Sequence, residues 1–173
     1  MDAKEKQLNY ERAEKLYAEQ NFAVAIVSGI ITMILGAGIY AVAALAAGGP
    51  SISVMIVAIG AAIGLTVQFL GRGIAGRFAV AASVLAMISY PLAKFFTIAL
   101  YTAKVEQLSA LELLSNERMS AMWKWILSAV GLLDLIFWVA AIGVAAYFST
   151  RRLSREDGLA IHTFERGHKQ LIE

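Results

Sequence analysis

The feature that most constrains this chain is a run of 52 residues without a single Asp, Glu, Lys or Arg, from Gln20 to Gly71. A hydrocarbon core about 30 Å thick requires roughly 20 apolar residues for each helical span. The run is therefore long enough for two membrane-crossing helices and a tight turn between them. Gly48-Gly49-Pro50-Ser51 is typical of such a turn, because glycine and proline interrupt helices.

The composition agrees with a membrane environment. Hydrophobic residues make up 59% of the 173 residues and charged residues only 16%, whereas a soluble domain usually has about 25% charged residues. The high content of hydrophobic residues and the low content of charged ones exclude intrinsic disorder. A formal net charge of +2 is too small to indicate nucleic acid as a partner. The chain has no cysteine, which excludes disulfides, thiolate metal sites and cysteine nucleophiles.

The hydropathy pattern predicts an all-α integral membrane protein with a bundle of four transmembrane helices. The expected spans cover about residues 22–47, 52–70, 78–102 and 122–148. This transmembrane domain, residues 22–148, lies between an amphipathic N-terminal helix at 1–21 and a basic C-terminal tail at 149–173. We expect short amphipathic cytoplasmic helices at both termini. The N-terminal helix is interpreted as a solvated extension of the first span, with docking to a partner as the alternative.

Two features lie in and after the third span. Pro91 is near its middle and predicts a kink, because proline donates no backbone hydrogen bond. Residues 104–121 follow, with apolar residues at helical spacing and a capping box at Ser109 and Glu112. They predict a short helix on the membrane surface.

The distribution of positive charge predicts the orientation. With four spans, both termini and the turn at residues 71–77 share one side of the membrane. That side has eleven Lys and Arg residues, and the other side has three. Because positively charged loops stay in the cytoplasm, both termini are expected there.

Lys94 and Asp134 lie inside apolar spans, where an ionisable group costs at least about 2.5 kcal/mol. Helical rise places them about 14 Å and about 18 Å from the outer ends of two antiparallel spans. We therefore predict a buried Lys94–Asp134 ion pair. It is interpreted as a packing and register device, with a proton or ion pathway, or separate partners for the two charges, as alternatives. Polar residues of the second and third spans are candidates to line a hydrated cavity with Lys94 or to bond neighbouring helices: Gln68 in the second, and Tyr90, Thr97, Tyr101 and Thr102 in the third.

Small residues allow helix backbones to approach closely in lipid. We therefore predict helix packing at Gly29 and Gly36 of the first span and at Gly60 and Gly64 of the second. Gly60 and Gly64 form a small-xxx-small motif of the kind that joins membrane helices.

Arg72 and Arg77 flank the glycine-rich turn between the second and third spans. Basic residues next to a span bind anionic lipid headgroups, so headgroup contact is predicted for both arginines. Orientation of the chain alone is the alternative explanation.

The sequence contains no convincing catalytic or metal-binding constellation. His162, Glu165 and His168 form an H-x-x-E-x-x-H pattern, but steps of three residues turn its ends roughly 120° apart on a helix. We therefore expect no metal, no cofactor and no enzymatic activity.

Several short motifs resemble a widespread family of small, functionally uncharacterised bacterial four-transmembrane-helix proteins. They are Gln20 before the first span, Ile59-Gly60 and Gly64, Gly71-Arg72-Gly73-Ile74 with Phe78 beyond, and Leu133-Asp134-Leu135-Ile136-Phe137. The resemblance covers about residues 20–150 and implies the four-span topology and a location in a bacterial inner membrane. The chain departs from the family at Lys94, where a small or amide residue is usual.

These features favour a non-catalytic membrane protein that acts by association. Its partners would be the lipid bilayer and either further copies of the chain or another membrane protein, for which it would be an accessory or scaffold subunit. The alternative is a small oligomeric channel or transporter with a polar intramembrane site at Lys94 and Asp134.

Overall fold

A computed structural model of the chain describes residues 3–48, 53–106, 124, 130–151 and 153–170. Over these residues the fold is all-helical, with no strand. The helices are α1 (Ala3–Ala18), α2 (Phe22–Ala46), α3 (Ser53–Gly71), α4 (Gly76–Glu106), α7 (Leu132–Phe148) and α8 (Arg155–Gln170). The predicted all-α class is confirmed for the part of the chain that the structure describes.

Three helices, α2, α3 and α4, are long and apolar enough to cross a membrane. The helix α7 is also apolar, but its 17 residues give a length of only about 25 Å. The helix α4 has 31 residues and continues on both sides of Pro91.

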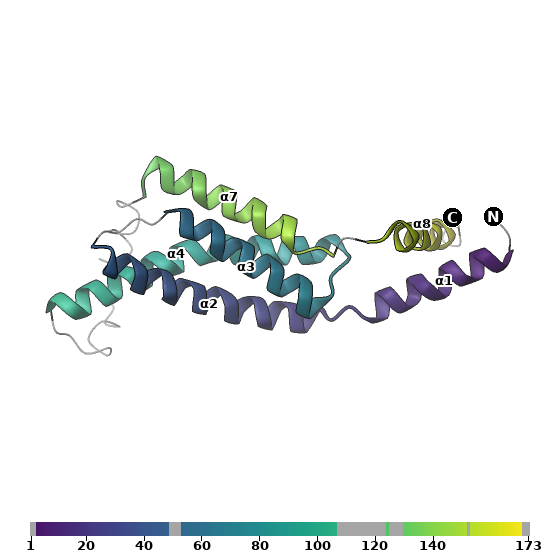
Figure 1. The fold of residues 1–173 in the computed structure, drawn as a ribbon, viewed down its shortest axis with the longest axis horizontal. Coiled ribbons are helices and arrows are strands. Elements are labelled where there is room, and N and C mark those ends of the chain that lie inside the picture. The colour runs from purple at the N-terminus through teal and green to yellow at the C-terminus, as the bar shows by residue number, and fades with distance from the viewer. Residues whose placement is uncertain (1–2, 49–52, 107–123, 125–129, 152, 171–173) are drawn as a thin grey trace.

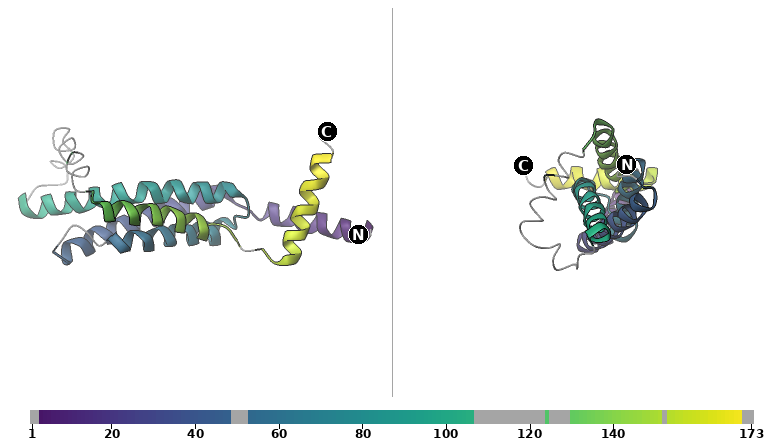
Figure 2. Two further views of the ribbon diagram at one scale, coloured as in Figure 1. Left: turned by 90° about the horizontal axis from the view of Figure 1, so that it is seen from above. Right: turned by 90° about the vertical axis from the view of Figure 1, so that its left-hand side faces the viewer.

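The helices α2, α3, α4 and α7 pack along one another in alternating directions, and we call them the apolar bundle (Figure 1). Both α2 and α7 pack against α3 and α4. The molecule is elongated, and α1 continues away from the bundle beyond the start of α2 (Figure 2). Both termini lie at the same end of the molecule, on the side of the α3–α4 turn (Figure 1).

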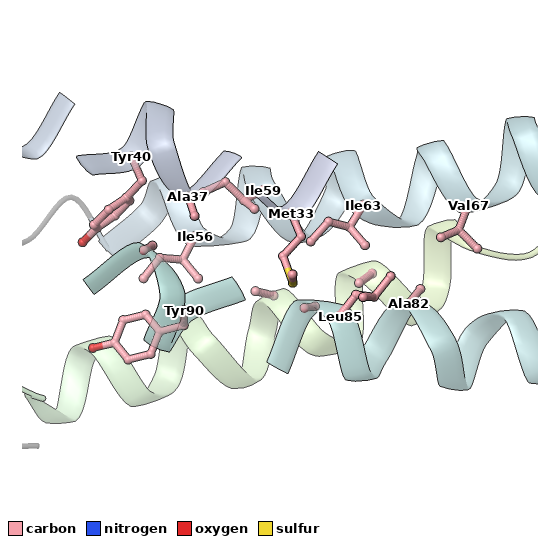
Figure 3. Close-up of a cluster of buried hydrophobic side chains, with 14 of the residues drawn as sticks. Met33, Ala37, Tyr40, Ile56, Ile59, Ile63, Val67, Ala82, Leu85 and Tyr90 are labelled. Carbon is pink, nitrogen blue, oxygen red and sulfur yellow. The ribbon is translucent and has the colours of Figure 1, made fainter. Parts of the chain in front are cut away.

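The bundle is apolar both inside and outside. Its core contains Ala37 of α2, Ile63 of α3 and Ala82 of α4, all fully buried (Figure 3). Ala141 of α7 is also fully buried in this core. Large apolar side chains also cover the outer surface, among them Phe69, which is 72% exposed. A helix that is apolar all round is typical of a membrane span, because lipid rather than water surrounds its outer face.

The predicted fourth span differs from the structure. Val130 and Gly131 are not helical and α7 begins at Leu132, so residues 122–148 do not form one continuous helix. Gly131 is the N-cap of α7, with extended backbone angles of φ −86° and ψ 163°. Glycine is a weak helix former, which favours a helix boundary at this position. Asp134 consequently lies in the first turn of α7 instead of deep within a helix.

Three chain segments meet where the bundle ends nearest the termini, and we call this junction the neck: residues 19–22, 71–78 and 149–151. The Asn21 amide donates to the Gly71 carbonyl at 3.0 Å, and the Arg151 amide donates to the Gly73 carbonyl at 2.9 Å. Arg72 has a φ of 48°, the left-handed conformation that closes the tight α3–α4 turn. The neck therefore connects the terminal segments to the bundle through backbone hydrogen bonds.

The helices α1 and α8 pack against each other outside the bundle, and we call them the terminal helix pair. Figure 2 shows α8 crossing α1. Their contact contains a small buried cluster of Ala13, Leu16, Ala160 and Ile161. At its edge Arg12 donates to Glu156 at 2.7 Å. The two terminal helices thus bury part of their apolar surface against each other, while Leu8 and Leu159 stay exposed.

Candidate functional site

Lys94 of α4 and Asp134 of α7 meet in the interior of the apolar bundle. Lys94 Nζ lies 3.4 Å from Asp134 Oδ2, and the two side chains are only 3% and 6% exposed. The structure therefore brings together the two residues of the predicted ion pair. Burial removes water from both charges at a high cost, which their mutual attraction offsets.

Asp134 also stabilises the start of α7. Its Oδ2 accepts a hydrogen bond from the Gly131 amide at 3.4 Å. A negative charge in the first turn is favourable, because unsatisfied amide groups give this end of a helix a partial positive charge. The carboxylate thus fixes the beginning of α7 and connects it to Lys94 of α4.

The ion pair lies toward the end of the bundle that is far from the neck. About 27 Å of helical rise separates Lys94 from the start of α4 at Gly76. The whole of α3 rises by about 28 Å, and α7 by about 25 Å from Phe148 to its first turn. Both α3 and α7 begin at about this level. The ion pair therefore lies near the end of the bundle that is far from the neck, which we call the outer end.

Aromatic side chains surround the ion pair. Lys94 Nζ lies 5.6 Å from the centre of the Tyr90 ring, within the range of a cation–π contact. The Tyr90 ring packs against Trp138 with 5.2 Å between centroids. The Tyr90 phenol also interacts electrostatically with Asp134 and Tyr40. Figure 3 shows the hydroxyl groups of Tyr40 and Tyr90 pointing toward the same end of the core.

A hydrogen bond from Trp138 replaces one that Pro91 cannot make. In a regular helix the amide of residue 91 would donate to the carbonyl of Met87, but proline has no amide hydrogen. The indole Nε1 of Trp138 donates to this carbonyl at 3.0 Å. Trp138 therefore joins α7 to α4 one turn from Asp134. Hydropathy gives no sign of this role of Trp138, although Pro91 indicates that the Met87 carbonyl requires another donor.

The other polar residues considered for a cavity do not gather at the ion pair. The Thr97 hydroxyl donates to the backbone of its own helix at 2.8 Å. Gln68 donates to a backbone carbonyl in the neck at 3.0 Å. Tyr101 is exposed, and Thr102 follows it near the end of α4. Of the residues in that prediction, Tyr90 alone lies against the pair.

The four predicted packing glycines lie at contacts between the chain's own helices. A Cβ atom on Gly60 would lie 2.5 Å from the Ala141 carbonyl oxygen of α7, which shows how closely the two backbones approach. Gly64 has the same relation to Ala145. Gly29 and Gly36 of α2 lie against side chains of α3 and α4. These glycines therefore pack the bundle itself, and Gly29, Gly60 and Gly64 are buried there.

The two arginines predicted to contact lipid have different environments in the neck. Arg72 lies 3.5 Å from Glu19, and the two side chains are 60% and 33% exposed. The guanidinium of Arg77 lies over the rings of Phe22 and Phe78, 5.3 Å from each centroid. The Glu19 carboxylate thus neutralises Arg72, whereas two aromatic rings position Arg77.

Of the H-x-x-E-x-x-H pattern, Glu165 takes part in the terminal helix pair. Glu165 accepts a hydrogen bond from the Tyr17 hydroxyl at 3.2 Å. Burial and the Glu165 carboxylate raise the pKa of Tyr17 above its ordinary value. His162 is exposed, and the side chain of His168 lies outside the described part of the structure. The predicted surface helix at 104–121 also lies outside the described residues from 107 onward.

Comparison of the chain with models of known families, with curated proteins and with solved structures gives no match. The resemblance to the four-span family therefore stays a prediction, and the functional inference rests on the chain's own residues.

Proposed function

We propose that this chain is a non-catalytic polytopic membrane protein that acts by association, as a homo-oligomer or as an accessory or scaffold subunit of a membrane complex. The observation that supports this best is the terminal helix pair. It lies outside the apolar bundle, so it adds nothing to the burial of apolar surface in lipid (Figure 1). A folded element of this kind, connected to the bundle by the neck, provides a surface for docking on the aqueous side.

The proposed topology has four spans, with α7 as the described part of the fourth. Both termini lie in the cytoplasm and the bundle lies in the inner membrane. The excess of Lys and Arg at the termini and at the 71–77 turn supports this orientation. The location of both termini beside the α3–α4 turn is consistent with it (Figure 1).

A second contact surface is available within the membrane. An apolar groove of about 600 Å³ lies on the exposed side of α2, with Leu35, Gly38 and Phe96 among its lining residues. Unlike the four packing glycines, Gly38 has no atom within 4 Å of the position of a Cβ. A small residue on the outer face of a span permits the close approach of another helix.

Native mass spectrometry of the particle extracted gently from membranes tests the proposal. We expect the full-length chain in a fixed multiple, or in a stoichiometric complex with a second membrane protein. A protein that remains monomeric and without a partner under conditions that preserve known membrane complexes would contradict it.

The buried polar cluster supports a second candidate, a small oligomeric channel or transporter. Lys94, Asp134, Tyr90 and Tyr40 lie together near the outer end of the bundle, where ionisable groups mark ion or proton pathways in other membrane proteins. In this candidate several copies would enclose a pathway that passes the ion pair.

Proton and ion flux into liposomes distinguishes the second candidate from the first. A channel or transporter predicts flux that disappears in Asp134→Asn and persists in Gly143→Ala, because nothing lies within 4 Å of a Cβ at Gly143 and the cluster stays intact. Equal flux in protein-containing and empty liposomes would exclude this candidate for the ions tested.

A further inference from the structure

We propose that the neck binds the phosphate group of an anionic lipid, and that Arg77 is the principal contact. The inference rests on the proposed insertion of the bundle in a membrane, which places the neck at the membrane surface. It extends that proposal by assigning an anionic lipid as ligand to Arg77 and not to Arg72.

Arg77 is positioned without being neutralised. Its guanidinium lies 5.3 Å from the ring centres of both Phe22 and Phe78, and these two rings contact each other edge to face. Among the described residues no carboxylate forms a salt bridge with Arg77. A cation–π contact leaves the guanidinium N–H groups able to donate to an anion. The side chain is therefore held in place with its charge available.

Arg72 is the natural comparison, because it lies in the same turn and is also exposed. Its guanidinium is 3.5 Å from the Glu19 carboxylate, which already provides an anionic partner. Binding of a phosphate to Arg72 would have to compete with that carboxylate. Arg77 is therefore favoured over Arg72 as the phosphate contact, because Arg72 already has a carboxylate partner.

The neck contains another arginine and, among the described residues, a polar group without a hydrogen-bond partner, while its Glu19 carboxylate is paired with Arg72. Gly73 lies directly against the Phe78 ring, and its carbonyl accepts from the backbone amide of Arg151. The side chain of Arg151 is exposed. The side-chain amide of Gln20, two residues before Phe22, is buried and has no hydrogen-bond partner among the described residues. An anion at the neck would therefore meet a positively charged, polar environment.

The position of Arg77 along the chain favours a lipid as the source of the phosphate. Phe22 is the first residue of α2, and Arg77 is the second residue of α4. The guanidinium therefore lies where the apolar helices begin, which is the level of the lipid headgroups. The planar guanidinium can donate two parallel hydrogen bonds to a phosphate, whereas an ammonium acts as a point charge.

Lipid retention in native mass spectrometry tests this inference on the full-length chain. The protein is reconstituted in nanodiscs with equal amounts of phosphatidylglycerol and phosphatidylcholine, then released, and the bound lipids are counted. We expect Arg77→Gln to reduce retained phosphatidylglycerol by about tenfold, the usual scale for loss of a charge-assisted hydrogen bond. The matched variant Arg72→Gln, with the same change in charge, should stay within about twofold of the original protein.

Two further variants separate positioning from charge. Arg77→Lys keeps the charge and should lose most of the preference, because the ammonium cannot reproduce the planar contact. Phe22→Leu preserves apolar volume without the aromatic ring, and should also weaken phosphatidylglycerol retention. Equal losses in Arg72→Gln and Arg77→Gln, or no loss in Arg77→Gln, would overturn the proposal.

The source of the phosphate and the membrane insertion are tested separately. If inorganic phosphate stabilises the solubilised protein through Arg77 while phosphatidylglycerol does not, the site takes a free anion and the lipid assignment is wrong. Flotation with phosphatidylcholine liposomes reports insertion independently of Arg77. Failure to float would contradict the proposed membrane topology, whereas normal flotation without selective retention would contradict only the lipid site.

Discussion

At the scale of single residues, the most informative positions are the charged pair inside the bundle. Lys94 and Asp134 could be predicted to meet, because antiparallel spans of known rise place them at similar depths. Their aromatic neighbours could not be predicted in the same way. Trp138 and Tyr40 are ordinary apolar-span residues in the sequence, and their roles depend on how α2, α4 and α7 are rotated about their axes.

Neutralising Asp134 tests the ion pair. Asp134→Asn retains the shape of the side chain but leaves the Lys94 ammonium buried beside an uncharged group, at a cost of about 3 kcal/mol. We expect a lower free energy of unfolding in detergent, measured with a chemical denaturant, and a lower folded yield.

The double variant Lys94→Met/Asp134→Asn is the control for this prediction. It removes both charges, so it should recover at least half of the stability lost in Asp134→Asn. If the two substitutions destabilise the protein additively, Lys94 and Asp134 are not coupled and the ion pair is without energetic significance.

Trp138 provides a second prediction at this scale. Trp138→Phe preserves a ring against Tyr90 but removes the donor to the Met87 carbonyl, which should cost about 1 kcal/mol. In a Pro91→Ala background residue 91 regains an amide that can donate to Met87, so the same substitution should cost less. Thermal unfolding of the original protein, the two single variants and the double variant measures this coupling, and an equal cost of Trp138→Phe in both backgrounds would disprove it.

At the scale of secondary-structure elements, hydropathy predicts α2 and α3 to within about two residues. These helices are uncharged and end at glycine-rich turns, and the Asn21 side chain caps the start of α2, so their boundaries are visible in the sequence. The start of α7 is different. Hydropathy is uniform on both sides of Gly131, and the boundary there depends on local hydrogen bonding by Asp134, which an average over a window cannot detect.

The close approach of α3 and α7 gives a prediction for this scale. Gly60→Ala would place a methyl group 2.5 Å from the Ala141 carbonyl oxygen, so the backbones must separate at a cost of about 1–3 kcal/mol. Gly38→Ala is the matched control, because nothing lies within 4 Å of its Cβ position. The free energy of unfolding in detergent should fall for Gly60→Ala only. Equal stability of the two variants would contradict the close packing of α3 and α7.

The contact between α1 and α8 should depend on pH. Because the pKa of Tyr17 is raised, the stabilising contribution of its protonated hydroxyl is complete below the ordinary tyrosine pKa of about 10. The contribution is lost as the pH rises through the higher value. Spin labels at Leu8→Cys and Leu159→Cys should therefore report separation of the helices at alkaline pH. Tyr17→Phe should abolish this pH dependence, and an unchanged transition would assign it to another group.

At the scale of the whole molecule, the sequence predicts a helical membrane protein with both termini on one side. The structure adds that the termini form a helix pair and that the packing glycines are used within the chain. Neither point could be read from the sequence. A small residue in a span indicates close approach but not which helix approaches, and an amphipathic helix can turn its apolar face to lipid or to another helix.

The central claim is that the bundle crosses the membrane with both termini in the cytoplasm. Cysteine accessibility in intact cells tests it most directly. The chain has no cysteine, so single substitutions are labelled without background. We use Leu8→Cys in α1, Leu159→Cys in α8 and Ala47→Cys at the far end of α2, all at exposed positions. A membrane-impermeant maleimide should label Ala47→Cys in intact cells, and the two terminal positions only after permeabilisation. Labelling of Leu8→Cys and Leu159→Cys from opposite sides, or of all three from one side, would contradict the proposed topology.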